Sequence, residues 1–411
     1  MRKIMISAIW VAMVITGCSK TNPGPADGPV PLNISEKSKQ IISADNRFGF
    51  ELFNKILKTD SSENLMISPF SVSTALSMTL NGADGQTLED MKQVLHFNDL
   101  VSDDFNASMK ELIHAILSVD PEVIMNIANS IWYRQDFFVE PAFLEINRKT
   151  YDAEVNALDF NNPASKDIIN GWVADQTNNK ITEIVDRINP LDVMFLINAI
   201  YFKGTWKYRF DEDNTQTLPF HISPSATVNV PTMIRKGDFA WFHNNILTAA
   251  ELDYGRGNFS MVILLPNQGY ELSDISDALT AENWNNWMNG FDTLYDAKIF
   301  LPRFTFSYDK PLKETLSDLG LGIAFNPDSA DFSRINPDKQ LYISSVKHKT
   351  FIEVNEEGTE AAAVTSVTVG TTSVGPETAI IIDKPFIFVI REKTTGVILF
   401  MGKVAHPALE E

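Results

Sequence analysis

Hydrophobic positions recur every three to four residues over much of the first half of the chain. From Ser35 onward, Ile41, Phe48, Leu52 and Ile56 fall on one helical face. A Ser68–Pro69 pair, typical of a helix start, opens a second helix. Helices are also predicted over residues 105–119, 141–150, 165–178, 273–289 and 309–319.

Runs of apolar and β-branched residues predict the strands. Residues 193–202 are almost continuously apolar, which is typical of a central strand covered on both faces. Strands are also predicted over residues 123–133, 154–160, 341–354 and 379–390, with several short ones between 217 and 266. Helices predominate first and strands later, without a linker between them. This pattern favours a single α+β domain over residues 35–411.

Residues 355–376 lie between two of the predicted strands and do not resemble an ordinary connection. Structureless loops of this length are uncommon in compact domains. From Val364 to Val374 the loop consists mostly of Val and Thr, which favour a pleated strand. Its first Pro is Pro376, so nothing before it blocks a ladder of backbone hydrogen bonds. The loop has the chemistry of a strand in the position of a loop, a conflict expected at functional sites.

The N-terminus resembles an export signal. Arg2 and Lys3 precede an apolar stretch that is too short to span a membrane, so residues 1–17 are predicted to be a signal peptide. Cys18, the single cysteine, ends this stretch in a pattern typical of bacterial lipoproteins. We expect Cys18 to carry a lipid anchor, with residues 18–34 as a flexible tether. The alternative is a stray thiol in an ordinary signal peptide.

Composition and motifs argue against several functions. The net charge of −19 and the lack of a basic cluster argue against nucleic-acid binding. The six histidines lack metal-ligand spacing, and the motifs of common hydrolases and of phosphate-binding loops are missing, so no metal, cofactor or catalytic residue is predicted. A serine and a histidine brought together by the fold would remain compatible with the sequence.

One polar residue interrupts the most apolar strand. Asn198 lies within residues 193–202, and a buried amide must find hydrogen-bond partners. Ser71 and His348 are candidate partners from a helix and a late strand. Two interpretations stay open: a satisfied polar network in the core, or a latch under a sheet that must open.

Several ordered motifs resemble the serpin family between residues 48 and 407. They are Asn64–Ser71 with Gly82–Thr87, Trp172–Val173 with Thr177 and Lys180–Ile181, Asn198–Trp206, Leu301–Phe304, Glu356–Ala363 and Asp383–Phe386. The resemblance implies a serpin fold of three β-sheets with eight or nine helices, and an exposed reactive loop that traps proteases.

The resemblance also assigns roles to residues. In serpins a protease cuts the loop, and the severed part inserts as a new strand into the main sheet. The hinge of this movement would be Glu356, Glu357, Gly358, Thr359, Glu360, Ala361, Ala362 and Ala363. A network that governs opening of the sheet would include Ser68, Ser71, Asn198 and His348, with Trp206 near the entry point of the loop. Val364 departs from the hinge pattern, where a small residue is usual, and predicts slower insertion at most.

The position of the cleaved bond depends on the counting direction. Counting from the hinge gives Thr372–Ser373, which we favour, and counting back from Asp383 gives Val374–Gly375. Residues 359–378 contain no Lys, Arg or aromatic side chain, so proteases with trypsin-like or large apolar pockets find nothing to bind. Small β-branched residues suit elastase-like or subtilisin-like enzymes.

The sequence therefore predicts a monomeric suicide-type inhibitor of serine proteases that prefer small residues. It would form a covalent complex with its target and be secreted, with lipidated Cys18 anchoring it to the cell envelope. The alternative is a non-inhibitory serpin-fold binding protein whose loop is only a substrate.

Overall fold

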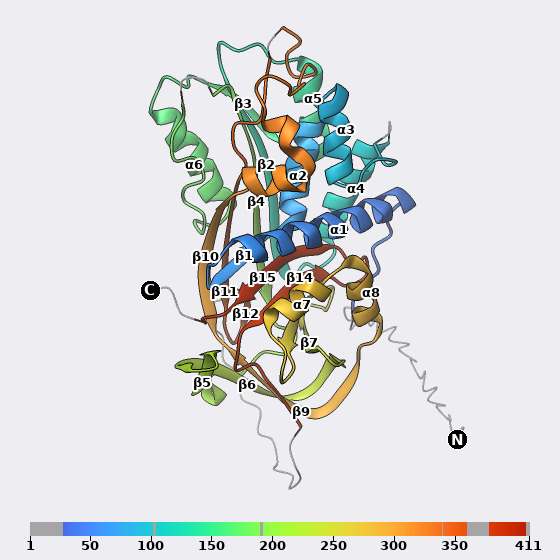
Figure 1. Ribbon diagram of the computed structural model, residues 1–411, viewed down its shortest axis with the longest axis vertical. Coiled ribbons are helices and arrows are strands. Elements are labelled where there is room, and N and C mark those ends of the chain that lie inside the picture. Colours follow the sequence, from blue (N-terminus) through green and yellow to red (C-terminus); the bar gives the residue numbers. More distant parts are fainter. Residues whose placement is uncertain (1–27, 102–103, 190–191, 339, 360–377, 408–411) are drawn as a thin grey trace, which may run out of the picture.

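The computed structural model describes residues 28–101, 104–189, 192–338, 340–359 and 378–407. In Figure 1, α2 to α5 lie at one end of the molecule and α7 and α8 toward the other, with strands running between them. The helices of the described residues are α1 (Glu36–Thr59), α2 (Pro69–Leu80), α3 (Gly85–Val94), α4 (Phe105–Ser118), α5 (Pro141–Tyr151), α6 (Ala164–Gln176), α7 (Leu272–Ala278), α8 (Ala281–Asn289) and α9 (Lys313–Leu316).

One sheet has six strands in the order β10-β11-β12-β4-β2-β3. These strands are β2 (Val123–Arg134), β3 (Glu154–Leu158), β4 (Met194–Thr205), β10 (Phe304–Pro311), β11 (Lys347–Val354) and β12 (Gly358–Thr359). Helix α2 packs on one face of β4, where Ser71 contacts Asn198. Helix α6 covers the other face, where Ile197 and Ala199 join an apolar cluster.

The second sheet has nine strands, in the order β1-β15-β14-β8-β7-β6-β9-β13 with β5 paired to β6. Its strands are β1 (Asn64–Ile67), β5 (Gln216–Ser223), β6 (Ala226–His243), β7 (Leu247–Tyr254), β8 (Phe259–Pro266), β9 (Asp292–Pro302), β13 (Ala379–Ile381), β14 (Phe386–Glu392) and β15 (Ile398–Val404). The β6–β9 pairing shifts register between Gly237 and Phe239. A bulge bends a sheet, so β6 and β9 link two of the three expected sheets into one hydrogen-bonded network.

The predicted helix starts and the central strand are confirmed, with one refinement. Ser35 and Ser68 cap α1 and α2, and each side chain accepts a hydrogen bond from a backbone N–H three residues later. Strand β4 is central, as predicted from residues 193–202. However, its first residues, Met194 to Leu196, are only partly buried. They pair with β2 on one edge and border a cavity on the other.

The prediction of a strand over residues 341–354 is wrong for its first six residues. Strand β11 begins at Lys347, because its partner β10 ends there with Pro311 opposite Lys347. Residues 341–346 have no ladder and instead make single bonds, such as Ile343 N–H to the Ala324 carbonyl at 2.8 Å. Local strand propensity does not form a strand without a partner edge.

Two other predicted boundaries are wrong for related reasons. Residues 309–311 belong to β10, and the expected helix is reduced to α9 and a wider turn, which continues through Gly320 at φ +116° to Leu321. The predicted strand over 379–390 divides into β13 and β14, which pair with different neighbours. Pro385, which has no N–H to donate, lies at this break.

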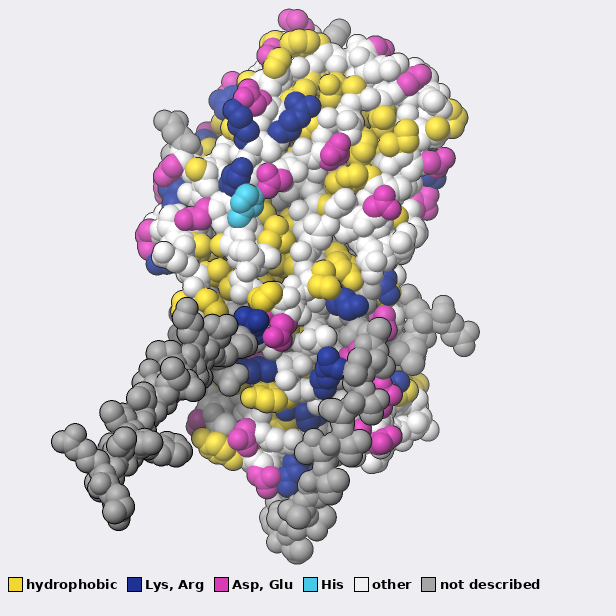
Figure 2. All heavy atoms as spheres, turned by 180° about the vertical axis from the view of Figure 1, so that it is seen from behind, with side chains coloured by type: hydrophobic (Ala, Val, Ile, Leu, Met, Phe, Trp, Pro, Cys, Tyr) yellow, Lys and Arg dark blue, Asp and Glu magenta, His cyan; other side chains and the backbone are white. Residues whose placement is uncertain are grey.

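Charged side chains are interspersed on the surface. On the face shown in Figure 2, acidic and basic side chains alternate with exposed apolar ones, so the net charge of −19 does not gather into one patch there. Interspersed charges keep a protein soluble without creating a strong steering field. This face therefore provides no uniform electrostatic surface for a nucleic acid or a membrane.

Candidate functional site: a gap in the six-stranded sheet

The six-stranded sheet is incomplete between β4 and β11. Strand β12 fills this position at one end only, with Thr359 opposite Gly204 of β4 and Val354 of β11. Beyond β12, no pairing joins β4 to β11 within the described residues. The sheet therefore has a gap between β4 and β11, and the two residues of β12 bridge it at one end.

The backbone of β12 requires a glycine at its first position. Gly358 has φ +152°, and a Cβ atom there would lie 2.0 Å from the carbonyl oxygen of Gly204. Thr359 is buried, and its hydroxyl is 2.7 Å from the Tyr254 hydroxyl. Tyr254 in turn stacks on Trp206 at 4.4 Å between ring centroids. The start of the predicted hinge thus rests on an aromatic pair.

The residues before β12 are held by backbone and ionic contacts. The N–H groups of Trp206 and Phe210 donate to the carbonyls of Glu357 and Glu356 at 2.7 and 3.0 Å. The Glu356 side chain is 3% exposed and pairs with Arg303, whose Nε donates to Oε1 at 2.7 Å. Thr215 also donates to the Glu356 carboxylate. A buried carboxylate is tolerated only with such partners.

The structure brings four of the five predicted network residues together under the gap. Ser68 N–H donates to His348 Nε2 at 2.9 Å, and Ser71 N–H donates to Ser68 Oγ at 3.2 Å. The Ser71 hydroxyl donates to Asn198. Asn198 lies on β4 and His348 on β11, so the start of α2 connects the two edges of the gap. Trp206 is separate, since it lies at β12.

Burial fixes the protonation state of His348. The side chain is buried on β11, and burial lowers its pKa to about 4. The neutral ring leaves Nε2 free to accept from Ser68 N–H. Protonation would therefore remove one of the contacts that hold β11 to α2.

Two members of this network were not predicted from the sequence. Asn198 Nδ2 donates to Asn129 Oδ1 at 2.6 Å, and Asn129 Nδ2 donates to the Tyr151 carbonyl at 2.8 Å. Asn129 interrupts the apolar strand β2 in the same way that Asn198 interrupts β4. The same signal, a polar residue within an apolar run, would have identified it.

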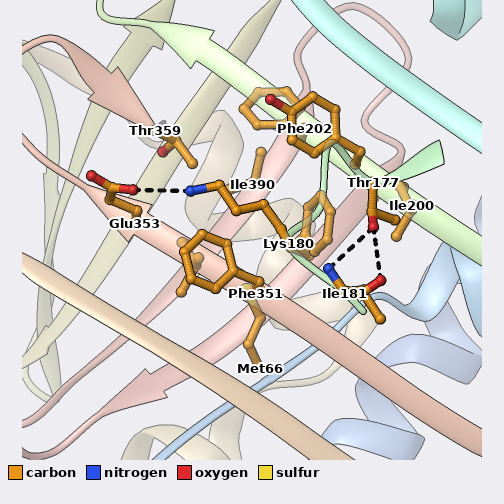
Figure 3. A pocket seen from close by; sticks show the side chains of 13 residues that line it. Met66, Thr177, Lys180, Ile181, Ile200, Phe202, Phe351, Glu353, Thr359 and Ile390 are labelled. Atoms are coloured by element: carbon orange, nitrogen blue, oxygen red, sulfur yellow. Dashed lines mark hydrogen bonds and ion pairs between the residues drawn. The ribbon is translucent and has the colours of Figure 1, made fainter. Parts of the chain in front are cut away.

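Two cavities lie along the gap between β4 and β11. A small one of about 20 Å³ lies beside β12, and Figure 3 shows that side chains from β4, β11 and other elements meet there. Its inner wall is apolar and includes Met66, Ile200, Phe202, Ile352, Ile390 and Phe400. A larger cavity of about 560 Å³ continues past Asn198 and His348, between the first half of β4 and residues 340–348.

Several predicted residues lie outside the described residues. They are Cys18, the hinge residues Glu360, Ala361, Ala362 and Ala363, and the candidate cleavage residues Thr372, Ser373, Val374 and Gly375. The described residues contain no helix that is long and apolar enough to cross a membrane. They also contain no group of three or more His, Cys, Asp or Glu side chains arranged to hold a metal ion.

Comparison with known proteins points to one family. The family described as "Serpin (serine protease inhibitor)" matches residues 43–407. An uncharacterized serpin-like protein of Thermococcus kodakarensis is 34% identical over 99% of both chains. The human leukocyte elastase inhibitor is 34% identical over 90% of this chain and 100% of its own.

A solved structure shows the same fold. Human thyroxine-binding globulin, complexed with thyroxine, superposes with a TM-score of 0.83 and 28% identity, over 90% of this chain and all of the other. The fold predicted from the sequence is thereby confirmed. The chain belongs to the serpin family, whose members are typically protease inhibitors and not enzymes.

Proposed function

We propose that this protein is a suicide-type inhibitor of serine endopeptidases that prefer small residues, such as elastase-like or subtilisin-like enzymes. The observation that carries the proposal is the gap beside β4, closed by only two residues of β12. Cleavage of the loop would free the chain after Thr359 to extend β12 along the gap. The inhibitor acts as a monomer and forms a covalent complex with its target.

The register of β12 defines where each residue of an inserted strand would lie. Continuing the pairing of Thr359 with Gly204 and Val354 brings Ala361 opposite Phe202 and Ile352. Ala363 would follow opposite Ile200 and Thr350. Because side chains alternate along a strand, both alanines would face the small apolar cavity beside β12. The cavity is small, so small side chains suit it.

The same register links the loop to the polar network. Two residues after Ala363, Thr365 would lie opposite Asn198 on β4 and His348 on β11. Its hydroxyl would then join the side chains that connect the two edges of the gap. Roughly ten new ladder hydrogen bonds, at about 0.5–1.5 kcal/mol each, would favour the inserted form by about 5–15 kcal/mol. That is the size of a typical protein's total stability.

A covalent adduct is the decisive test. The protein is incubated separately with pancreatic elastase, subtilisin and trypsin, and the products are separated on a denaturing gel. The proposal expects a stable adduct with elastase or subtilisin and none with trypsin. Cleavage at 372–375 without any adduct would instead support the alternative of a serpin-fold binding protein whose loop is only a substrate.

We further propose that the inhibitor is exported and held at the cell envelope by lipid on Cys18. The support is the position of Cys18 at the end of the apolar N-terminal stretch. Residues 18–34, rich in Pro, Gly and Asn, would serve as the tether between this lipid and the folded domain. Wild-type protein is expected in the detergent-soluble membrane fraction. Cys18→Ser should be recovered in the aqueous fraction, and equal partitioning of both would contradict the anchor.

A further inference from the structure

An arginine on β6 has no acidic partner. Arg235 is half-buried, and no hydrogen bond or ion pair joins its guanidinium group to another part of the chain that the structure describes. Its Nε atom is buried without a partner, whereas the two Nη atoms reach solvent. The chain has 53 Asp and Glu against 34 Lys and Arg, so acidic partners are plentiful. Their absence at this cation therefore needs an explanation.

Three aromatic rings face the guanidinium group. Its central carbon lies 4.3 Å from the ring centroid of Phe239, 5.5 Å from that of Tyr208 and 5.8 Å from that of Phe210. Phe239 and Phe210 are buried, whereas Tyr208 is 61% exposed and marks the open side. Aromatic rings attract a cation and hold it in place, but they leave most of its N–H groups free to donate elsewhere.

The acidic residue whose charge acts on Arg235 is already bound by another cation. This residue is Asp253, and its carboxylate pairs with Lys393 at 2.6 Å. Burial lowers the pKa of Arg235 to about 10, so its side chain keeps its charge at neutral pH. Burying an unpaired cation costs the folded protein stability. A guanidinium group with free N–H groups is, however, well suited to bind a carboxylate through two parallel hydrogen bonds.

Arg235 lies between the two ends of the loop at residues 360–377. On one side, the N–H of Phe210 donates to the carbonyl of Glu356, just before β12. On the other side, Arg235 is in register with Ile299 of β9, and Ile299 is in register with Ile380 of β13, just after the loop. Neighbouring strands are about 4.8 Å apart, so Arg235 lies about 10 Å from β13. In Figure 1, β6 and β9 lie below β12.

A protease that binds the loop would therefore cover the surface around Arg235. Protease–inhibitor interfaces bury about 800 Å² on each partner, which is more than a few extended loop residues supply. The enzyme thus also contacts the scaffold beside the loop. Exclusion of water from this contact would strengthen the attraction between the guanidinium group and a carboxylate.

We propose that Arg235 is a second specificity determinant of this inhibitor, which binds one Asp or Glu side chain on the surface of the protease that the loop engages. The identity of the partner as a protease rests on the proposed function. The loop selects an enzyme with a shallow pocket, and Arg235 selects one with an acidic residue beside that pocket. A protease with Lys or Arg at the same place would be rejected by charge repulsion.

Docking of an inactive protease measures this contact before any bond is cut. Subtilisin and pancreatic elastase, each with its nucleophilic serine replaced by alanine, are titrated against the immobilised inhibitor to obtain dissociation constants. Arg235→Gln should weaken the binding of at least one enzyme by about 10- to 100-fold, the range for hydrogen bonds to a charged group. Arg235→Lys keeps the charge without the planar fork and should recover only part of the loss.

The next residue of β6 provides the matched control. Lys236 points to the opposite face of the strand and pairs with Asp296 at 3.0 Å. Lys236→Gln removes the same unit of charge from the same strand, so it should weaken docking by less than about 5-fold. Equal weakening by Arg235→Gln and Lys236→Gln would indicate a general charge effect and overturn the proposal. Unchanged docking of both enzymes to Arg235→Gln would do the same.

Replacements on the protease identify the partner. Single changes of Asp to Asn and of Glu to Gln around the active-site cleft should include one that weakens docking to the wild-type inhibitor by the same factor. That change should have no effect on docking to Arg235→Gln, because the interaction is already lost. If no acidic residue of the enzyme behaves in this way, Arg235 acts through packing or a small anion and the proposal fails. The wild-type arm stays informative if Arg235→Gln folds poorly.

Adduct formation with the active enzymes separates this inference from the proposed function. Docking that depends on Arg235, combined with cleavage of the loop and no adduct, would end the inhibitor proposal and leave the contact standing. An adduct that forms with an enzyme whose docking does not depend on Arg235 would support the inhibitor and remove Arg235 from its specificity.

Discussion

The two ends of the gap are built differently. At the β12 end, Glu356 is buried in an ion pair with Arg303, and Thr359 rests against Tyr254. At the far end, polar contacts to α2 connect β11 and β4, and a cavity of about 560 Å³ lies between them. The first end is fixed and defines the register, whereas the second has the unfilled space. Under the proposed function, β12 would lengthen from its fixed end into the unfilled space.

The largest effect, a loss of covalent adduct, is expected from a charge introduced at the β12 end of the gap. Thr359→Arg would bury a cation beside the Tyr254 hydroxyl, and taking a charge out of water is costly. The variant should still be bound and cut by the protease. The yield of covalent adduct should fall about tenfold or more, measured by densitometry of denaturing gels. Undiminished adduct would contradict insertion through β12.

The next largest effect, a loss in the free energy of unfolding, is expected from removal of the Arg303 side chain. Arg303→Ala leaves the 3% exposed carboxylate of Glu356 without its cation, which costs about 3–5 kcal/mol for a buried pair. Denaturant unfolding measures the loss. Arg47→Ala is the control, because Arg47 and Glu51 form an exposed pair on α1 worth about 0.3–0.5 kcal/mol. Similar losses in both variants would show that the β12 end is not especially fixed.

At the far end of the gap, the free energy of unfolding should depend on pH through His348. Its pKa is lowered to about 4, so the unfolded chain binds a proton before the folded protein does. The stabilisation is complete above pH about 6.5 and is lost as pH falls toward 4, by about 3 kcal/mol in total. Unfolding free energies from pH 4 to 8 measure this, compared with His348→Gln, which does not titrate.

The comparison with His348→Gln also removes the opposing pH dependence of stability that Asp45 contributes. Burial raises the pKa of Asp45 to about 7, so its contribution to stability is lost as pH rises toward 7. Asp45 is present in both proteins, and its effect cancels in the difference. A difference between the two proteins that does not change with pH would argue against a neutral, buried His348.

The smallest effect is expected from the newly identified network member. Asn129→Ala removes the acceptor for Asn198 and the donor to the Tyr151 carbonyl, and buried unpaired groups cost about 1–3 kcal/mol. Thermal unfolding should show the loss. Asn161→Ala, at an exposed position, should change stability by no more than about 0.5 kcal/mol. Equal shifts would remove Asn129 from the network.

The sequence alone was sufficient for the fold and for the contact between Ser71 and Asn198. His348, the other expected partner of Asn198, instead accepts from Ser68 N–H. Polar residues inside apolar runs identify buried networks, because each buried amide or ring needs a partner. It was not sufficient for residues 341–346, whose strand propensity has no partner edge in this state. The Glu356–Arg303 pair was also missed. Charged pairs distant in sequence leave no periodic pattern, and only the fold brings them together.

Strand β12 also converts chemical energy into directed force under the proposed mechanism. On the edge of β4 that faces the gap, ten residues remain without a partner strand, from Lys203 back to Met194. They span about 33 Å at about 3.3 Å per residue. If roughly 10 kcal/mol is released over that distance, the mean pull on a protease attached to the cut end is on the order of 20 pN. The two paired residues at Gly358 and Thr359 set the direction of this pull before the protease arrives.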